Sequence, residues 1–184
     1  GITGSLASGK TTASKLLSAR RGPLFIADLV VQKIYKNINF KKNISKKFQI
    51  KSYLDIKSSL KKKILEDRSN IRKLEKIIHP LVRKEMIKFT KRNKKKKFIF
   101  FEIPLLVESN LMSYFDIIFF VKAKKKIRLR RFKSKGGNVK LFNFLNKKQL
   151  KDTKKMEYCD HIIVNEGNLN ILKKKLSDIF KKYE

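Results

Sequence analysis

The residues best suited to chemistry lie near the start of the chain, in the segment Gly4-Ser5-Leu6-Ala7-Ser8-Gly9-Lys10-Thr11. Its spacing matches G-x-x-x-x-G-K-[ST], in which two glycines let successive backbone N–H groups point into one hollow. A helix that starts there adds its positive end to the same place. The segment therefore predicts a triphosphate site at residues 4–12, with cofactor-binding contacts from Gly4, Ala7, Ser8, Gly9, Lys10, Thr11 and Thr12. The alternative interpretation is a glycine turn before an ordinary helix.

Two side chains would complete such a phosphate site. Lys10 would reach the β- and γ-phosphates as a point charge, and the Thr11 hydroxyl would bind the Mg²⁺ that bridges them. The motif needs a helix after it, and apolar residues recur at helical spacing from Ala13 to Leu17. It also needs a strand before it, and only residues 1–3 precede the loop. We therefore expect further apolar residues of this first strand to lie upstream of the sequence.

Acidic residues occur at the ends of two later apolar segments. Asp28 follows the expected strand at 24–27, and open α/β sheets bind ligands at the ends of their strands. Asp28 is thus expected to face the phosphate loop from the end of the neighbouring strand, or else to cap the helix that follows. Glu102 lies in the apolar run 97–103, where a buried charge needs a partner such as Mg²⁺ or its water shell. Glu108, in the next loop, is expected to cap or to pair with a lysine.

The pattern along the chain predicts an α/β fold. Strands are expected before the phosphate loop and at 24–27, 97–103, 116–121 and 161–164, and helices alternate with them, including long ones at 141–156 and from 169 onward. Such alternation predicts a five-stranded parallel sheet covered on both faces. Residues 41–92 read as helices only, with a kink or restart at Pro80. The basic segment from Ile127 to Gly137 is either a lid over phosphates or an exposed basic helix.

Composition narrows the class of protein. A chain of 184 residues with 41% hydrophobic residues suits one compact domain with a small inserted subdomain. The single cysteine, Cys159, excludes an internal disulfide and is expected to be a small, partly buried apolar residue. No apolar run is long enough to span a membrane, so a cytoplasmic protein is expected.

The net charge of +33 raises the question of nucleic acid as a partner. The lysines are spread along the chain, with one local run at Lys94–Lys97, and no aromatic stacking motif accompanies them. Nucleic-acid binding is therefore disfavoured, and an AT-rich genome accounts for the composition more simply. The charge could still attract anionic substrates.

Several segments together resemble the dephospho-CoA kinases, the enzymes that complete coenzyme A synthesis. They fall in order and at family-like separations across essentially the whole chain. The phosphate loop alone is shared by many NTPases, and the combination with His-Pro-Leu-Val and Pro-Leu-Leu-x-Glu is more particular. The segments are Gly1–Thr12, Ala27-Asp28, Ile78–Arg83, Ile103–Glu108 and Cys159–Asn165.

The resemblance implies ATP-dependent phosphorylation of the ribose 3′-hydroxyl of dephospho-CoA, giving CoA and ADP, with ATP and Mg²⁺ as cofactors. It also implies the three-layer P-loop NTPase fold with a helical CoA-binding subdomain and a lid. On this basis the core is expected at about 1–40, 97–130 and 158–184, the helical subdomain at about 41–92 and the lid at about 131–145.

By matching positions, the resemblance also suggests roles. Lys10, Asp28 and Arg131 are the catalytic candidates, with Asp28 near the acceptor hydroxyl and Arg131 as the lid arginine. Asp28, His79 and Arg83 belong to the acceptor side, and Thr11 and Glu102 to the metal. The chain departs from the family at two places. Ile26-Ala27-Asp28 stands where the family has Asp-x-Asp, so the first acid is missing. Lys135 replaces a second lid arginine, and a lysine cannot make a bidentate contact with a phosphate.

Two other functions remain open at this point. One is another small-molecule or nucleotide kinase, such as an adenylate-kinase-like enzyme. The other is a basic nucleic-acid-binding protein with a vestigial phosphate loop. A GTPase is disfavoured because the sequence has no Asn-Lys-x-Asp signature. A monomer or weak homo-oligomer that acts on a small molecule, away from membranes, is expected.

Overall fold

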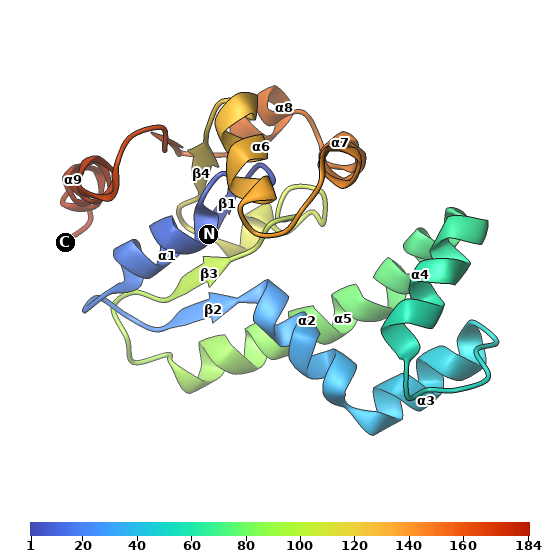
Figure 1. Ribbon diagram of the computed structural model, residues 1–184. Coiled ribbons are helices and arrows are strands. Elements are labelled where there is room, and N and C mark those ends of the chain that lie inside the picture. The colour runs from blue at the N-terminus through green and yellow to red at the C-terminus, as the bar shows by residue number, and fades with distance from the viewer. The chain divides into compact units, whose positions relative to one another are not determined.

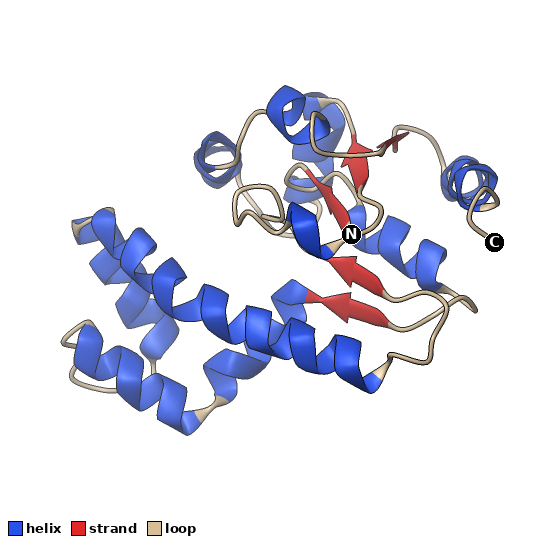
Figure 2. Ribbon diagram, turned by 180° about the vertical axis from the view of Figure 1, so that it is seen from behind, coloured by secondary structure: helices blue, strands red, loops and turns tan.

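The computed structural model describes residues 1–184 and contains one five-stranded sheet, in which every pair of neighbouring strands is parallel (Figure 2). The strand order is β2-β3-β1-β4-β5. The expected five-stranded parallel sheet is therefore confirmed. The strands are β1 (Ile2–Gly4), β2 (Leu24–Ile26), β3 (Phe100–Glu102), β4 (Phe119–Lys122) and β5 (His161–Val164).

The chain divides into two compact units (Figure 1). The sheet unit comprises Gly1–Ile26 and Asn93–Glu184, and the helical unit comprises Ala27–Arg92. The structure thus places the boundary after residue 26, whereas the sequence suggested that the core extends to about residue 40. The difference arises because the first helix after β2 packs against other helices of the helical unit.

Helices of the sheet unit bury the apolar faces of the strands. Helix α1 contributes Ala13 and Leu17, and α9 contributes Leu172, Leu176 and Phe180 at helical spacing to the same core cluster as β1, β3, β4 and β5. The helices are α1 (Lys10–Ser18), α6 (Lys125–Lys133), α7 (Val139–Lys148), α8 (Asp152–Met156) and α9 (Leu169–Phe180), with a 3₁₀ turn at Met112–Tyr114.

The expected single helix at 141–156 is wrong, because the chain is extended between α7 and α8. Gln149 has φ −81° and ψ 150°, outside the helical region. Its side-chain oxygen accepts a hydrogen bond from the Leu6 N–H at 3.0 Å, and the Leu150 N–H donates to Glu108 Oε1 at 3.1 Å. Bonds to distant loops thus replace the helical ones. Strands β3 and β4 are also shorter than expected, and they begin at Phe100 and Phe119.

The helical unit has a core of its own. One helix contributes Phe40 and Ile44, together with Phe48 at its end, and the next helix contributes Ile56 and Leu60. None of the helices in either unit is both long and apolar enough to cross a bilayer. The helices of this unit are α2 (Ala27–Lys36), α3 (Ile38–Lys47), α4 (Ile56–Glu66) and α5 (Ser69–Arg92).

Helix α5 runs past Pro80 as one helix, so of the expected kink or restart near His79 the restart is wrong. Proline has no amide hydrogen, so the carbonyl four residues earlier, that of Lys76, loses its helical donor. In the turns before this point, Leu74, Ile77 and Ile78 pack α5 against the core of the helical unit.

Candidate active site

The loop between β1 and α1 has a backbone shape that depends on its glycines. Gly4 has φ 149° and Gly9 has φ 94°, which L side chains rarely adopt. A Cβ atom at residue 4 would lie 2.3 Å from the carbonyl oxygen of Val121, and one at residue 9 would lie 2.2 Å from Asn165 Nδ2. Both glycines of the motif are therefore required by close neighbours as well as by conformation.

This loop presents backbone donors that the protein does not use. The N–H groups of Ala7, Gly9, Thr11 and Thr12 donate to no acceptor of the protein, and the first helical bond of α1 runs from Ala13 N to Gly9 O. The Ser8 hydroxyl is buried and also has no hydrogen-bond partner. Unsatisfied donors at a helix N-terminus form a site for an anion such as a phosphate group.

Lys10 brings a positive charge to the same loop. Its largely buried side chain folds back so that Nζ donates to the carbonyl oxygen of Ser5 at 2.8 Å. The first turn of α1 contains no acidic residue that could oppose an anion there. The charge of Lys10 and the helix dipole therefore act in the same direction.

Glu102 and Thr11, the two metal candidates, lie in direct contact. The Thr11 hydroxyl donates to Glu102 Oε1 at 2.6 Å, and the Ser14 hydroxyl donates to Oε2 at 3.1 Å. Glu102 is only 2% exposed, so these two bonds offset part of the cost of burying its carboxylate. Ser14 was not among the residues singled out from the sequence.

The oxygen atoms of this contact suit a hard cation. Mg²⁺ is commonly held by one or two side-chain oxygens together with substrate phosphates rather than by a complete protein cage. Nowhere in residues 1–184 do three or more His, Cys, Asp or Glu side chains gather to form such a cage. The Thr11–Glu102 pair beside a phosphate loop therefore fits a nucleotide-bound Mg²⁺.

The predicted lid arginine lies against the phosphate loop. Arg131 Nη1 donates to the carbonyl oxygens of Ser8 at 3.1 Å and of Asn165 at 3.0 Å. Asn165 itself donates from Nδ2 to the Ser8 carbonyl at 2.8 Å. Sequence reasoning did not single out Asn165 as a site residue, although it follows β5 directly at the edge of the sheet where ligands bind.

A second arginine, Arg128, supports the loop from inside the protein. It is 6% exposed, and its guanidinium donates to the carbonyl oxygens of Ala123 and Leu6 and to Asn146 Oδ1. Burial lowers the pKa of Arg128, and the charge of Asp152 opposes that shift. Such tertiary contacts leave no local sequence signal, and they explain why this residue was missed.

Glu108 and Cys159 both make contacts that stabilise the fold, as expected. Glu108 Oε1 lies 2.6 Å from Nζ of Lys155, which is fully buried. This confirms that Glu108 pairs with a lysine. Cys159 is partly buried, and its Sγ donates to the Lys155 carbonyl oxygen at 3.1 Å. Burial raises the pKa of the Cys159 thiol to about 11, with a further contribution from Asp160.

Asp28 is the second residue of α2, directly after β2. The alternative that it caps this helix is wrong, because the helix already begins at Ala27 and the exposed Asp28 carboxylate bonds to no backbone N–H. The strand before it is also not the neighbour of β1 as expected, since β3 lies between β1 and β2. Asp28 thus offers a carboxylate without a partner in the protein.

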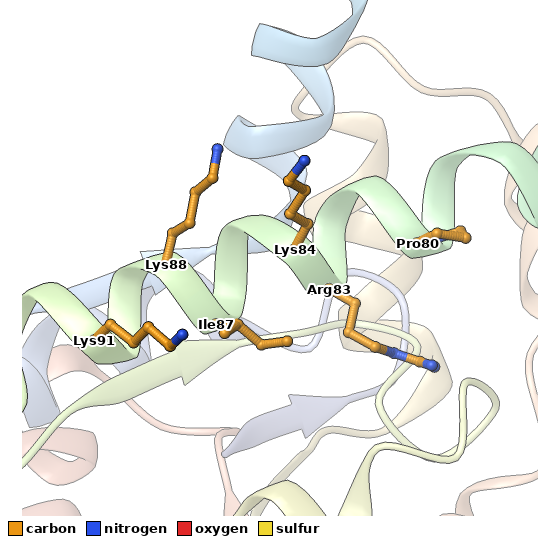
Figure 3. A pocket seen from close by; sticks show the side chains of 6 residues that line it. All are labelled: Pro80, Arg83, Lys84, Ile87, Lys88 and Lys91. Atoms are coloured by element: carbon orange, nitrogen blue, oxygen red, sulfur yellow. The ribbon is translucent and has the colours of Figure 1, made fainter.

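The other acceptor-side candidates, His79 and Arg83, lie four residues apart on α5, where residues share one face. A hollow of about 400 Å³ runs along this helix (Figure 3). Lys88 pairs with Glu85 at 2.8 Å, whereas the other three cations of the hollow have no acidic partner. Mainly apolar atoms, including the methylene groups of these side chains, form the wall of the hollow, and Arg83 but not His79 lines it. The lining residues are Pro80, Arg83, Lys84, Ile87, Lys88 and Lys91.

Comparison with protein families and curated proteins gives one consistent result. The family described as dephospho-CoA kinase matches residues 1–170. The dephospho-CoA kinase of Rickettsia typhi is 31% identical over 185 residues, covering 100% of this chain and 96% of that protein. The dephospho-CoA kinase of Bartonella quintana is 34% identical over 168 residues, covering 89% of this chain and 86% of that protein.

Solved structures resemble the fold over nearly its whole length. A Thermus thermophilus structure matches with a TM-score of 0.82 at 24% identity and covers 98% of this chain and 95% of its own. The Campylobacter jejuni dephospho-CoA kinase matches with a TM-score of 0.69 at 19% identity and covers 98% and 94%. At these identities the similarity supports the fold.

Proposed function

The chain belongs to the dephospho-CoA kinase family, and we propose that its phosphate loop and Asp28 together carry out the ATP-dependent phosphorylation of the ribose 3′-hydroxyl of dephospho-CoA. The observation that carries this proposal is the set of unused backbone donors of Ala7, Gly9, Thr11 and Thr12, in a chain whose family match covers residues 1–170. In phosphoryl transfer, positioning and charge neutralisation supply most of the catalysis.

The phosphate oxygens of ATP would accept hydrogen bonds from the unused N–H groups of the loop. The Lys10 side chain would leave the Ser5 carbonyl oxygen and reach the β- and γ-phosphates. Arg131 has five N–H donors, and only those of Nη1 are used by the backbone carbonyls of Ser8 and Asn165. Its Nη2 and Nε groups are thus available to oxygens of the transferred phosphoryl group, as a catalytic arginine requires.

The proposal also includes a Mg²⁺ ion at Thr11 and Glu102. The Thr11 hydroxyl donates its hydrogen bond to Glu102, so the lone pairs of its oxygen can face a cation. Glu102 would stand behind the ion, in contact with Thr11 and with the ion's water shell. Thr11 and Glu102 would hold the ion, whose charge would neutralise part of the negative charge of the phosphates.

The acceptor is assigned to residues of the helical unit. Asp28 would accept or direct the proton of the 3′-hydroxyl, because its carboxylate has no partner in the protein and follows the carboxyl end of β2. Arg83 would offer its guanidinium to a phosphate group of the acceptor, and His79 lies one turn before it on α5. We also propose a cytoplasmic location and a monomeric or weakly associating chain.

The test of this function is a coupled assay of ADP release with dephospho-CoA, adenosine, AMP and shikimate compared as acceptors. We expect rapid turnover with dephospho-CoA and at most slow turnover with the others. Preference for AMP would instead support a nucleotide kinase. A basic nucleic-acid-binding protein would show no turnover stimulated by any acceptor, together with tight and steeply salt-dependent binding of DNA or RNA.

A further inference from the structure

Asn165 is fixed in place beside the phosphate loop. It directly follows β5, is 6% exposed, and its backbone N–H donates to the Lys122 carbonyl oxygen at 2.8 Å. Its side-chain Nδ2 donates to the Ser8 carbonyl oxygen at 2.8 Å, and its own carbonyl oxygen accepts from Arg131 Nη1 at 3.0 Å. Asn165 therefore joins three parts of the sheet unit: the end of β4, α6 and the phosphate loop.

These contacts determine the orientation of one peptide group. Ser8 C=O and Gly9 N–H belong to the same planar trans peptide and point in opposite directions. Because Asn165 and Arg131 both hold the Ser8 carbonyl oxygen, the Gly9 N–H must point away from them. That N–H is one of the loop donors that no acceptor of the protein uses. Asn165 can thus aim a phosphate-binding donor without touching the phosphate.

The second glycine of the motif fits this arrangement. A Cβ atom at residue 9 would lie 2.2 Å from Asn165 Nδ2, far inside any van der Waals contact. Only glycine lets the asparagine amide approach the Ser8–Gly9 peptide so closely. Gly9 and Asn165 are therefore complementary, although they are distant in the sequence.

We propose that Asn165 is a positioning residue of the kinase, which holds the Ser8–Gly9 peptide and Arg131 in the orientation that binds the phosphates of the nucleotide. This inference rests on the proposed function and adds a residue to it. It predicts that Asn165 affects affinity for a phosphate chain even when no base is attached, and that it does not affect the acceptor.

The test compares Asn165→Ala and Asn165→Asp with Asn170→Ala, which changes an exposed asparagine of α9. Calorimetry measures the binding of inorganic tripolyphosphate, and steady-state kinetics give the KM for ATP and for dephospho-CoA. We expect the tripolyphosphate Kd and the KM for ATP to rise roughly tenfold in both Asn165 variants, the loss expected for one well-made hydrogen bond. The KM for dephospho-CoA at saturating ATP should stay within about twofold. Asn170→Ala should match the wild type throughout.

Asn165→Asp keeps the side-chain size but cannot donate to Ser8, and its negative charge should weaken phosphate binding further, so it is the variant most able to contradict the proposal. If it binds tripolyphosphate like the wild type, the positioning role is excluded. A higher KM for ATP with unchanged tripolyphosphate binding would also exclude it, because Asn165 would then contact the base. Thermal unfolding verifies that each variant is folded, and should Asn165→Ala be unfolded, the isosteric variant alone decides. Tripolyphosphate binding needs no acceptor, so failure of the dephospho-CoA assignment would be seen separately, in the turnover of the wild type.

Discussion

At the scale of single residues, the chemistry depends on how buried polar groups are satisfied. Glu102 lies inside the sheet unit, and hydroxyl groups of Thr11 and Ser14 donate to its two oxygens. A carboxylate held in this way can orient the Thr11 hydroxyl, so its charge and both of its acceptors matter.

We predict that Glu102→Gln raises the Mg²⁺ concentration needed for half-maximal activity roughly tenfold, as is typical when a residue behind a metal ligand is changed. The amide removes the charge and one of the two acceptors, while the volume stays the same. Glu85→Gln is the control, because Glu85 is in an exposed pair with Lys88. A Mg²⁺ titration that is identical for Glu102→Gln and the wild type would contradict the role of Glu102.

Cys159 provides a pH-dependent prediction. The pKa of its thiol is raised to about 11 by burial, and only the thiolate reacts with disulfide reagents. Labelling with an aromatic disulfide should therefore be slow at about pH 8 and accelerate as the pH approaches the raised pKa, whereas an ordinary thiol is already largely reactive near pH 9. The labelling rate of the native protein across this pH range checks this. Reaction at the rate of free cysteine near pH 8 would show that the thiol is not shielded.

At the scale of elements, α8 is tied to the loop after β3 by the buried pair of Lys155 and Glu108. Lys155 Nζ also lies 3.4 Å from the Pro104 carbonyl oxygen, and Glu108 Oε2 has no hydrogen-bond partner. Removing one member of such a pair leaves the other charge buried without compensation.

We predict that Lys155→Met lowers the free energy of unfolding by about 3 kcal/mol, measured by urea denaturation. Lys154→Met is a matched control on the same helix, because Lys154 pairs with Glu157 at the surface, and it should change stability by less than about 0.5 kcal/mol. Adding Glu108→Gln to Lys155→Met should recover part of the loss. Equal effects of the two lysine variants would contradict the importance of the buried pair.

How far the sequence predicts the elements depends on whether the signal is local. The apolar run of β5 and the stripe of α9 were predicted at the correct positions, because periodicity and turn residues determine both. The break between α7 and α8 was not predicted, because it depends on bonds from Gln149 and Leu150 to loops more than 40 residues away.

The same distinction applies to the candidate site. The phosphate loop could be predicted because its chemistry is contained in eight consecutive residues. Its supports, Arg128 and Asn165, could not be predicted, since each acts through hydrogen bonds to backbone carbonyls that are more than 100 residues away. A polar residue at the carboxyl end of a predicted strand, as Asn165 is, was the one available signal.

At the scale of the whole molecule, the residues proposed to bind ATP and those proposed to bind the acceptor belong to different units. The groups assigned to ATP lie in the sheet unit, whereas Asp28, His79 and Arg83 lie in the helical unit. The net charge of +33 gives the protein a positive field, which would favour the approach of its anionic substrates.

This division predicts that Asp28→Asn lowers kcat by about a hundredfold or more, the range expected for loss of a general base. The Kd for ATP, measured by calorimetry, should not change, because no group that binds ATP is removed. Asp55→Asn, an exposed change in the same unit, is the control and should leave both kcat and the Kd for ATP unchanged. If turnover were intact in Asp28→Asn, the role of Asp28 would be wrong.

The central claim is that the loop at residues 4–12 holds ATP for transfer to dephospho-CoA, and the most direct measurement follows a label in the γ-phosphate of ATP. With the wild type we expect the label in the 3′-phosphate of CoA. With Lys10→Ala, which removes the charge that reaches the transferred group, we expect the rate of labelling to fall about a hundredfold or more. Equal labelling by the two proteins, or no labelling of CoA by the wild type, would contradict the claim.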